Sequence, residues 1–196
     1  MICIYHKKIG KIWCVAATEN ESVVATTFAT SEGDVLKSLL AGLPYNAPFQ
    51  MADETSQFSQ RLLSAMGGIL RGEEVLVDFE LEMKHVSDYS RKVLGCVYKV
   101  PVGYVTTYKA VADAVGGSPR AVGRVMATNP FPPIVPCHRV VCSDFTLGGF
   151  GGGFGTGVKM KKEILEREDR GYRKPTGIKV NGKDLALFPV GFLRKD

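Results

Sequence analysis

Hydrophobic and polar positions alternate along the first part of the chain in a way that predicts strands and one helix. Runs rich in β-branched residues, separated by polar breaks, predict consecutive strands at residues 2–5, 11–17 and 22–29. Apolar residues at helical spacing within residues 56–70 predict a helix, and the alternation over residues 75–81 predicts a further strand. We therefore expect an N-terminal α/β domain over residues 1–84, with a structural role.

From Ser87 onward the pattern is mainly helical. Ser87 can cap a first helix, and Thr106 or Thr107 can cap a second helix that ends in a glycine pair. Ser118, with a proline directly after it, can cap a third helix. The short glycine connection between the second and third helices predicts a helix-turn-helix, a pattern that any helical hairpin also gives.

The remaining stretches have distinct compositions. Prolines in residues 130–136 exclude a helix and predict an extended approach to the next residue. Residues 148–157 are rich in glycine, which indicates close approach to another body or a flexible flap, and residues 158–167 predict a final helix. The tail, residues 171–196, keeps enough apolar side chains that we expect it to pack on the body. Together these elements predict a second domain over residues 85–196.

Charge and hydropathy exclude some classes of protein. The chain has 196 residues, and its 25 Lys and Arg against 20 Asp and Glu give a net charge of +5, which suits a polyanionic partner but is common among soluble proteins. No apolar run approaches the roughly 20 residues of a membrane span, and the first residues do not resemble a signal peptide. We therefore expect no membrane association and a cytoplasmic location, or a nuclear one if the source is a eukaryote.

The five cysteines do not predict a disulfide framework, because their number is odd and their spacing uneven. Cys3, His6 and Cys14 together suggest a metal site, but they lack a paired C-x2-C motif and a fourth ligand. Small thiols within strand-like runs usually belong to a core. We therefore expect no metal.

The most informative motif is Pro136-Cys137-His138-Arg139-Val140. A cysteine acts as a nucleophile through its thiolate, and a histidine beside it can carry the proton, so the pair could serve a hydrolase, a peroxidatic site or an alkyl acceptor. Of the other two histidines, His6 lies in the predicted N-terminal domain and His85 at its boundary with the second domain, which makes His138 the expected base. Adjacent side chains of an extended strand point to opposite faces, so this role requires a bridging water or a bent backbone.

This motif resembles the active-site signature of the O6-alkylguanine-DNA alkyltransferases, which move an alkyl group from guanine in DNA to their own cysteine. Three further stretches resemble the family: V-P-V-G-Y-V-T-T-Y at 100–108, R-A-V-G at 120–123 and the charged helix at 161–168. The resemblance implies an α+β fold. The implied fold consists of a ribonuclease-H-like α/β module followed by a mainly helical domain with a helix-turn-helix.

The resemblance also implies roles for five catalytic residues. Cys137 is the alkyl acceptor, and His138 is the base that draws its proton through water. Glu168 is the carboxylate that holds His138, although Glu163 and Glu166 on the same predicted helix compete for that role. Tyr108 helps the guanine oxygen depart, and Asn129 ties the recognition helix to the active-site turn.

By the same resemblance, the everted base lies in a pocket formed by Met126, Val140, Gly151 and Lys161. Gly151 stands where the family commonly has serine, which leaves only a backbone NH to contact the base.

DNA contacts are implied for the third predicted helix and its start. Arg120 fills the gap that the everted nucleotide leaves, and Arg124 contacts phosphate. Ser118, Ala121 and Gly123 are small enough to let the helix backbone lie close to the minor groove, which carries little sequence information.

The implied function is DNA repair by direct, irreversible, single-turnover transfer of the alkyl group from O6-alkylguanine to Cys137, with O4-alkylthymine as a further candidate substrate. No cofactor is expected, the partner is double-stranded DNA that contains alkylated guanine, and we expect a monomer. The alternatives are a helix-turn-helix regulator, an alkyltransferase-like protein that binds damage without repairing it, and a Cys–His hydrolase.

Overall fold

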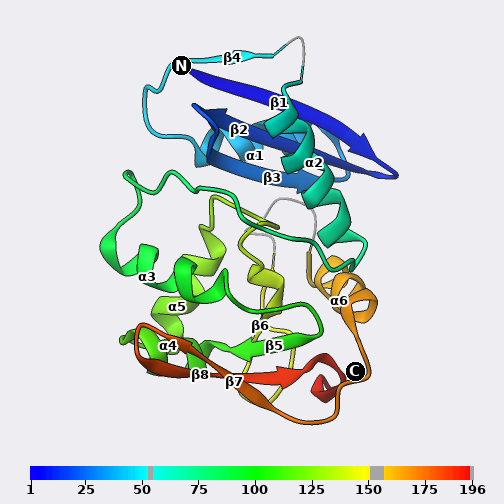
Figure 1. Ribbon diagram of the computed structural model, residues 1–196, viewed down its shortest axis with the longest axis vertical. Coiled ribbons are helices and arrows are strands. Elements are labelled where there is room, and N and C mark those ends of the chain that lie inside the picture. Colours follow the sequence, from blue (N-terminus) through cyan, green and yellow to red (C-terminus); the bar gives the residue numbers. More distant parts are fainter. Residues whose placement is uncertain (53–54, 151–156, 195–196) are drawn as a thin grey trace.

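The computed structural model describes residues 1–52, 55–150 and 157–194. Two sheets lie at opposite ends of the long axis, with helices between them, and the chain passes from the first end to the second (Figure 1). The fold is therefore α+β, as the sequence predicted.

The N-terminal sheet confirms the three predicted strands and adds a fourth. Its strands are β1 (Ile2–Ile9), β2 (Ile12–Glu19), β3 (Ser22–Ala29) and β4 (Phe49–Met51). Their order is β3-β2-β1-β4, with β4 parallel to β1 and the other pairs antiparallel. The strand β4 was not predicted, because it has only three residues and all of them are exposed.

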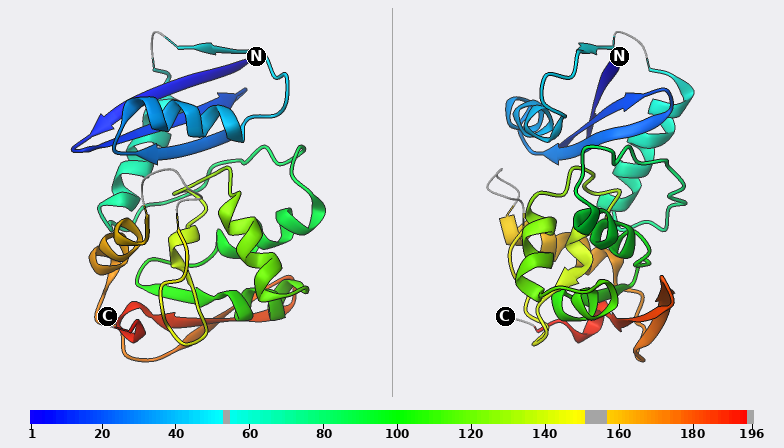
Figure 2. Two further views of the ribbon diagram at one scale, coloured as in Figure 1. Left: turned by 180° about the vertical axis from the view of Figure 1, so that it is seen from behind. Right: turned by 90° about the vertical axis from the view of Figure 1, so that its left-hand side faces the viewer.

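Two helices cover opposite faces of this sheet. Helix α2 (Gln57–Leu70) confirms the predicted helix and packs on one face, and α1 (Glu32–Gly42) packs on the other (Figure 2). Alternate residues of β2 supply the two cores, since Cys14 and Ala16 face α2 whereas Val15 and Ala17 face α1. Helix α1 was not predicted, although Ser31 caps it and its apolar residues Val35, Leu36, Leu39 and Leu40 recur at helical spacing.

The predicted strand at residues 75–81 is wrong. Residues 71–80 form no ladder, and Leu81 makes a single parallel bridge to Val23. The segment is an extended connector in which Phe79 is buried against the ring of Phe58. Its apolar alternation therefore reflects packing against the core without a neighbouring strand.

The predicted helices of the second half are all present. They are α3 (Asp88–Val97), α4 (Tyr108–Val115), α5 (Pro119–Ala127) and α6 (Gly157–Glu168). Ser87, Thr107 and Ser118 cap the first three, and each side-chain oxygen accepts a hydrogen bond from the backbone N–H three residues later. The glycine pair after α4 turns the chain directly into α5.

A second sheet, which the prediction of a mainly helical domain omitted, forms the other end of the molecule. Its strands are β5 (Tyr104–Thr107), β6 (Val140–Val141), β7 (Thr176–Val180) and β8 (Lys183–Pro189), in the order β6-β5-β8-β7. The tail pairs with the body through β8 and β5, which confirms that it packs back. Strands β6 and β5, with two and four residues, give too little alternation to be recognised locally. Strands β7 and β8 are longer, and their apolar residues were predicted only to pack on the body.

The two halves share one hydrophobic cluster, which includes Leu62 and Met66 of α2 together with Leu94 of α3 and Ile164 of α6. Polar contacts reinforce the junction, since Arg167 donates to the carbonyl of Leu70 (3.0 Å). Arg170 donates to the carbonyl of Gly72. The C-terminal end of α2 is thereby capped by cationic side chains, which suits the negative pole of a helix.

We expect Gly72→Ala to lower the free energy of unfolding by about 3 kcal/mol, because strain and overpacking add. Gly72 has φ +76°, and an added Cβ would lie 2.6 Å from the backbone of Arg167. Gly10 is the matched control, since it has φ +62° but an added Cβ would meet nothing within 4 Å, so Gly10→Ala should cost only about 1 kcal/mol. Urea unfolding of both variants tests this, and equal losses would show that the contact with Arg167 is unimportant.

Candidate active site

Cys137 begins a short 3₁₀ turn, η1 (Cys137–Arg139), at the end of the proline-rich approach. The side chain of Asn129 fixes that approach, because its Nδ2 donates to the carbonyl of Val135 (3.0 Å) and its Oδ1 accepts from the N–H of Phe131 (3.0 Å). Asn129, just after the C-cap of α5, thus links that end of the helix to the segment before the turn. The turn is also the bent backbone that a joint role for Cys137 and its neighbour requires.

His138 is fully buried, and its Nε2 lies 2.9 Å from Oε1 of Glu168. A carboxylate only accepts, so Nε2 carries the hydrogen and Nδ1 keeps its lone pair. Nδ1 has no hydrogen-bond partner within the described part of the chain. Burial lowers the pKa of His138, so the ring is a neutral base with an open acceptor position.

Glu168 is the only one of the three candidate carboxylates that faces His138. It is fully buried and accepts from Arg139 at both oxygens, from Nε (2.9 Å) and from Nη2 (2.8 Å). Burial alone would raise the pKa of Glu168, but His138 and Arg139 lower it to about 2. Glu163 instead pairs with Arg167 at the surface, and Glu166 is exposed.

Sequence reasoning missed Arg139. Its guanidinium holds Glu168 at two atoms, and its Nη1 donates to the carbonyl of Val100 (2.6 Å). It thereby balances the buried carboxylate and leaves His138 neutral. Its place inside the cysteine motif was the available signal.

Lys161 is buried on the other side of the turn. Its Nζ donates to the carbonyls of Val140 (2.6 Å) and Leu147 (2.7 Å), and burial lowers its pKa to about 8. Val140 is fully buried and takes part through this carbonyl. The Lys161 Nζ also lies 5.9 Å from the centre of the Tyr108 ring, and burial raises the pKa of Tyr108 to about 12, so the phenol stays protonated.

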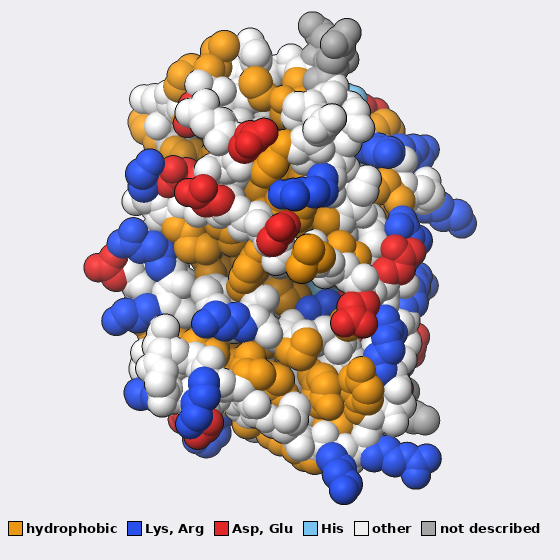
Figure 3. Space-filling model, in the orientation of Figure 1, with side chains coloured by type: hydrophobic (Ala, Val, Ile, Leu, Met, Phe, Trp, Pro, Cys, Tyr) orange, Lys and Arg blue, Asp and Glu red, His pale blue; other side chains and the backbone are white. Residues whose placement is uncertain are grey.

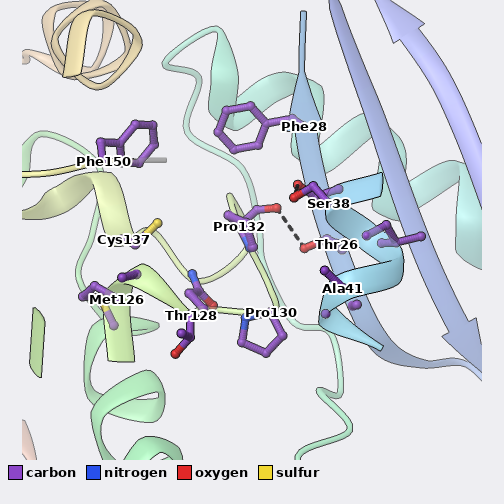
Figure 4. Close-up of a pocket in the computed structure, with 16 residues that line it drawn as sticks. Thr26, Phe28, Ser38, Ala41, Met126, Thr128, Pro130, Pro132, Cys137 and Phe150 are labelled. Carbon is purple, nitrogen blue, oxygen red and sulfur yellow. Dashed lines mark hydrogen bonds between the residues drawn. The ribbon is translucent and has the colours of Figure 1, made fainter. Parts of the chain in front are cut away.

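A pocket of about 340 Å³ opens beside Cys137 (Figure 4). Met126, Asn129, Pro132 and Phe150 line it on the side of the C-terminal half, and the sulfur of Cys137 points into the space between Phe150 and Pro132. This volume lies at the lower end of the range for small-molecule sites, about 300–1,000 Å³. Burial raises the pKa of the Cys137 thiol, while a hydrogen bond from Asn129 and the charge of Lys161 oppose this rise.

The predicted site residues therefore meet only in part. Cys137, His138, Glu168, Asn129 and Lys161 surround one turn, and Met126 lines the adjoining pocket. Tyr108 is connected to these residues by the contact between its ring and the Nζ of Lys161. Gly151 lies outside the described residues.

The predicted DNA-contacting residues lie on α5 and just before it. Ser118, Arg120 and Arg124 are exposed, whereas Ala121 and Gly123 are half-buried. An added Cβ at Gly123 would lie 4.0 Å from the Tyr108 ring, so the helix passes close to that phenol. On the face drawn in Figure 3, hydrophobic side chains line a hollow near the middle, and Lys and Arg side chains lie both beside this hollow and toward the edges.

The Glu168 carboxylate should make stability depend on pH. Its pKa is lower in the folded protein than the unfolded value near 4.3, so its contribution is complete above that value and is lost as the pH falls toward about 2. We expect the difference in unfolding free energy between the protein and Glu168→Gln to shrink by about 3 kcal/mol over this window. Urea unfolding at several pH values measures it, with the exposed Glu166→Gln as the control whose difference should stay small.

Among residues 1–52, 55–150 and 157–194 there is no cluster of three or more His, Cys, Asp or Glu side chains suited to a metal ion. In the same described ranges, no helix combines the length and apolar character needed to cross a membrane.

Comparison with known proteins supports the resemblance seen in the motifs. Residues 88–170 match the family described as 6-O-methylguanine DNA methyltransferase, DNA binding domain. The chain is 42% identical over 110 residues to the methylated-DNA–protein-cysteine methyltransferase of Methanothermobacter thermautotrophicus, covering 56% of this chain and 60% of the relative. It is 49% identical over 88 residues to the protein of the same name from Pyrobaculum aerophilum, covering 45% and 56%. The matched stretches thus span less than two thirds of these relatives.

Solved structures extend the similarity to both halves of the chain. The O6-methylguanine-DNA methyltransferase of Pyrococcus kodakaraensis is similar with a TM-score of 0.61 and 29% identity, over 86% of this chain and 99% of that one. Mycobacterium tuberculosis OGT in complex with DNA has the same fold, with a TM-score of 0.65 and 21% identity over 85% and 92%. These matches confirm the resemblance that the motifs indicated.

Proposed function

We propose that the protein repairs DNA by moving the alkyl group of O6-alkylguanine irreversibly to Cys137, once per molecule and without a cofactor. O4-alkylthymine is a further candidate substrate. The observation that carries the proposal is the meeting of the Cys137 sulfur, which faces a pocket, with a buried neutral His138 that Glu168 orients. The names of the similar proteins agree with it.

The reaction begins with a proton transfer. Nδ1 of His138 accepts the thiol proton through a water, and the His138 cation that results is stabilised by the Glu168 carboxylate. The thiolate attacks the alkyl carbon, a new S–C bond forms as the C–O bond breaks, and the electron pair leaves with the guanine oxygen. The protonated phenol of Tyr108 donates a hydrogen bond to that oxygen and stabilises the charge that it gains. The thioether product is a very poor leaving group, which explains why no second turnover follows.

DNA binding is proposed for the hairpin of α4 and α5, used as a helix-turn-helix in the minor groove. Arg120 takes the place of the everted guanine, Arg124 contacts phosphate, and the small Ser118, Ala121 and Gly123 let the backbone approach. The partner is double-stranded DNA with an alkylated guanine, bound by a monomer. The protein would act where that DNA is, in the cytoplasm or, if the source is a eukaryote, in the nucleus.

The N-terminal half is proposed to be a ribonuclease-H-like module over residues 1–84, followed by the alkyltransferase domain over residues 85–196. The strand order β3-β2-β1-β4, with one helix on each face, supports the first part. A regulator or a non-repairing damage binder would need no acceptor cysteine poised beside a base, and the chain has one.

Intact-mass measurement after incubation with a duplex oligonucleotide that contains O6-methylguanine tests the function. We expect each molecule to gain the mass of one CH2, with the adduct mapped to Cys137. Repeated turnover, or an adduct elsewhere, would contradict the proposal.

Replacing Arg120 separates DNA handling from chemistry. We expect Arg120→Ala to bind duplex DNA more weakly and to slow repair about tenfold or more, because the duplex loses the side chain that fills its gap. Reaction with free O6-benzylguanine should stay near normal, since no duplex is involved. Stopped-time assays on both substrates compare them, and an equal loss on both would place Arg120 in the pocket or the fold.

A further inference from the structure

One wall of the pocket beside Cys137 comes from the N-terminal half. Residues 25–28 of β3 and the end of α1, with Ser38, Leu39, Ala41 and Gly42, line the side across from the sulfur. In Figure 4, Phe28 and Ser38 lie across the space into which the Cys137 sulfur points. A side of the pocket is thus supplied by a part of the chain to which the motifs assigned only a structural role.

This wall is fixed to the active-site segment by specific contacts. The backbone N–H of Thr26 donates to the carbonyl of Pro130 (2.8 Å), and its hydroxyl donates to the carbonyl of Pro132 (2.9 Å). The rings of Phe28 and Phe150 lie with their centres 6.4 Å apart. Because β3 is bonded to the same proline segment that positions Cys137, the distance between wall and sulfur is set by the fold.

The part of the wall at the end of α1 leaves room because its side chains are small. Ala41 and Gly42 end α1, and an added Cβ at Gly42 would meet nothing within 4 Å. Ser38 and Thr27 pair their hydroxyls with each other (3.3 Å). The wall is therefore largely apolar, and the hydroxyls of Ser38 and Thr27 already have each other as hydrogen-bond partners. Such a wall suits a hydrocarbon better than a charged group.

We propose that β3 and the end of α1 set the largest alkyl group that the protein accepts. The inference rests on the proposed alkyl transfer. Displacement requires sulfur, alkyl carbon and guanine oxygen to lie nearly in line, so the other substituents of that carbon project sideways into the space around the sulfur. A methyl group has only hydrogens there, whereas a benzyl group places a ring beside the wall.

The test compares transfer rates from O6-methylguanine and O6-benzylguanine in the same duplex sequence. Ala41 is exposed but lines the pocket, so we expect the ring added in Ala41→Phe to enter the pocket next to Gly42. The ratio of benzyl to methyl rates should then fall at least about tenfold, since overpacking of about 1.4 kcal/mol already gives that factor. Gly42→Leu should lower the ratio in the same direction. The matched control is Leu40→Phe, because Leu40 is the neighbouring residue of α1, is exposed and does not line the pocket.

Each outcome bears on one of the two proposals. If the unaltered protein transfers neither group, the proposed function itself fails. If it transfers methyl but not benzyl, the function stands but the wall leaves no room for a ring. If Ala41→Phe and Gly42→Leu keep the unaltered ratio, the function stands and the wall does not set the size limit. Equal slowing of both substrates would show that the wall holds the base instead. Circular dichroism and thermal unfolding establish that each variant is folded.

Discussion

Cys137→Ser is expected to end alkyl transfer completely while the protein still binds duplex DNA. A serine hydroxyl is far harder to deprotonate than a thiol, and it is a much weaker nucleophile than a thiolate toward an alkyl carbon. The change is nearly isosteric, so the pocket and the exposed side of α5 should keep their shape. Intact-mass measurement reports transfer, and fluorescence anisotropy with a labelled duplex reports binding.

Cys142→Ser is the matched control for this prediction. Cys142 is half-buried and lies five residues after Cys137 in the same segment, and it has no place in the proposed proton path. We expect that variant to accept one alkyl group at a normal rate. An adduct on Cys142, or residual transfer by Cys137→Ser, would show that Cys137 is not the acceptor.

His138→Leu is expected to slow transfer by about 10²–10⁴-fold near neutral pH, the usual contribution of a general base. The substitution removes the acceptor nitrogen but leaves the Glu168–Arg139 pair intact, so no buried charge loses its counter-charge. The difference in rate between the variant and the unaltered protein should narrow as the pH rises, because the thiol of a growing fraction of molecules then loses its proton directly to solvent. The unaltered protein should keep its rate down to slightly acidic pH, because the pKa of His138 is lower than usual.

Single-turnover rates from about pH 6 to about pH 9.5 measure this difference, over a range that spans ordinary histidine and cysteine pKa values. A structural role for His138 would give a loss that does not vary with pH. That result, together with a lowered unfolding temperature, would remove His138 from the proton path.

Local signals were sufficient for much of the fold. The caps at Ser87, Thr107 and Ser118 are short-range hydrogen bonds, and a single sequence contains all the information that they need. The second sheet depends on pairing between β5 and β8, about eighty residues apart, which no local pattern records. The wrong strand at residues 75–81 has the opposite cause, because alternation shows which side chains are buried but not whether another strand lies alongside.

The choice among three glutamates illustrates the same limit at the site. Only the rotation of α6 about its axis decides which carboxylate reaches His138. A signal was nevertheless present, since Lys161, Ile164, Leu165 and Glu168 recur at helical spacing and all four are buried. A charged residue on an otherwise apolar helical face needs a buried partner, and the cysteine motif offered both His138 and Arg139.

The bonds from Arg167 and Arg170 to the end of α2 bracket Glu168 on both sides. The acid that steers the active-site histidine is therefore anchored to a helix of the other half. A shortened chain that began after residue 84 would forfeit these anchor points and one side of the chamber around the sulfur. The N-terminal half therefore helps to hold the active-site residues in position, and its removal should disturb them.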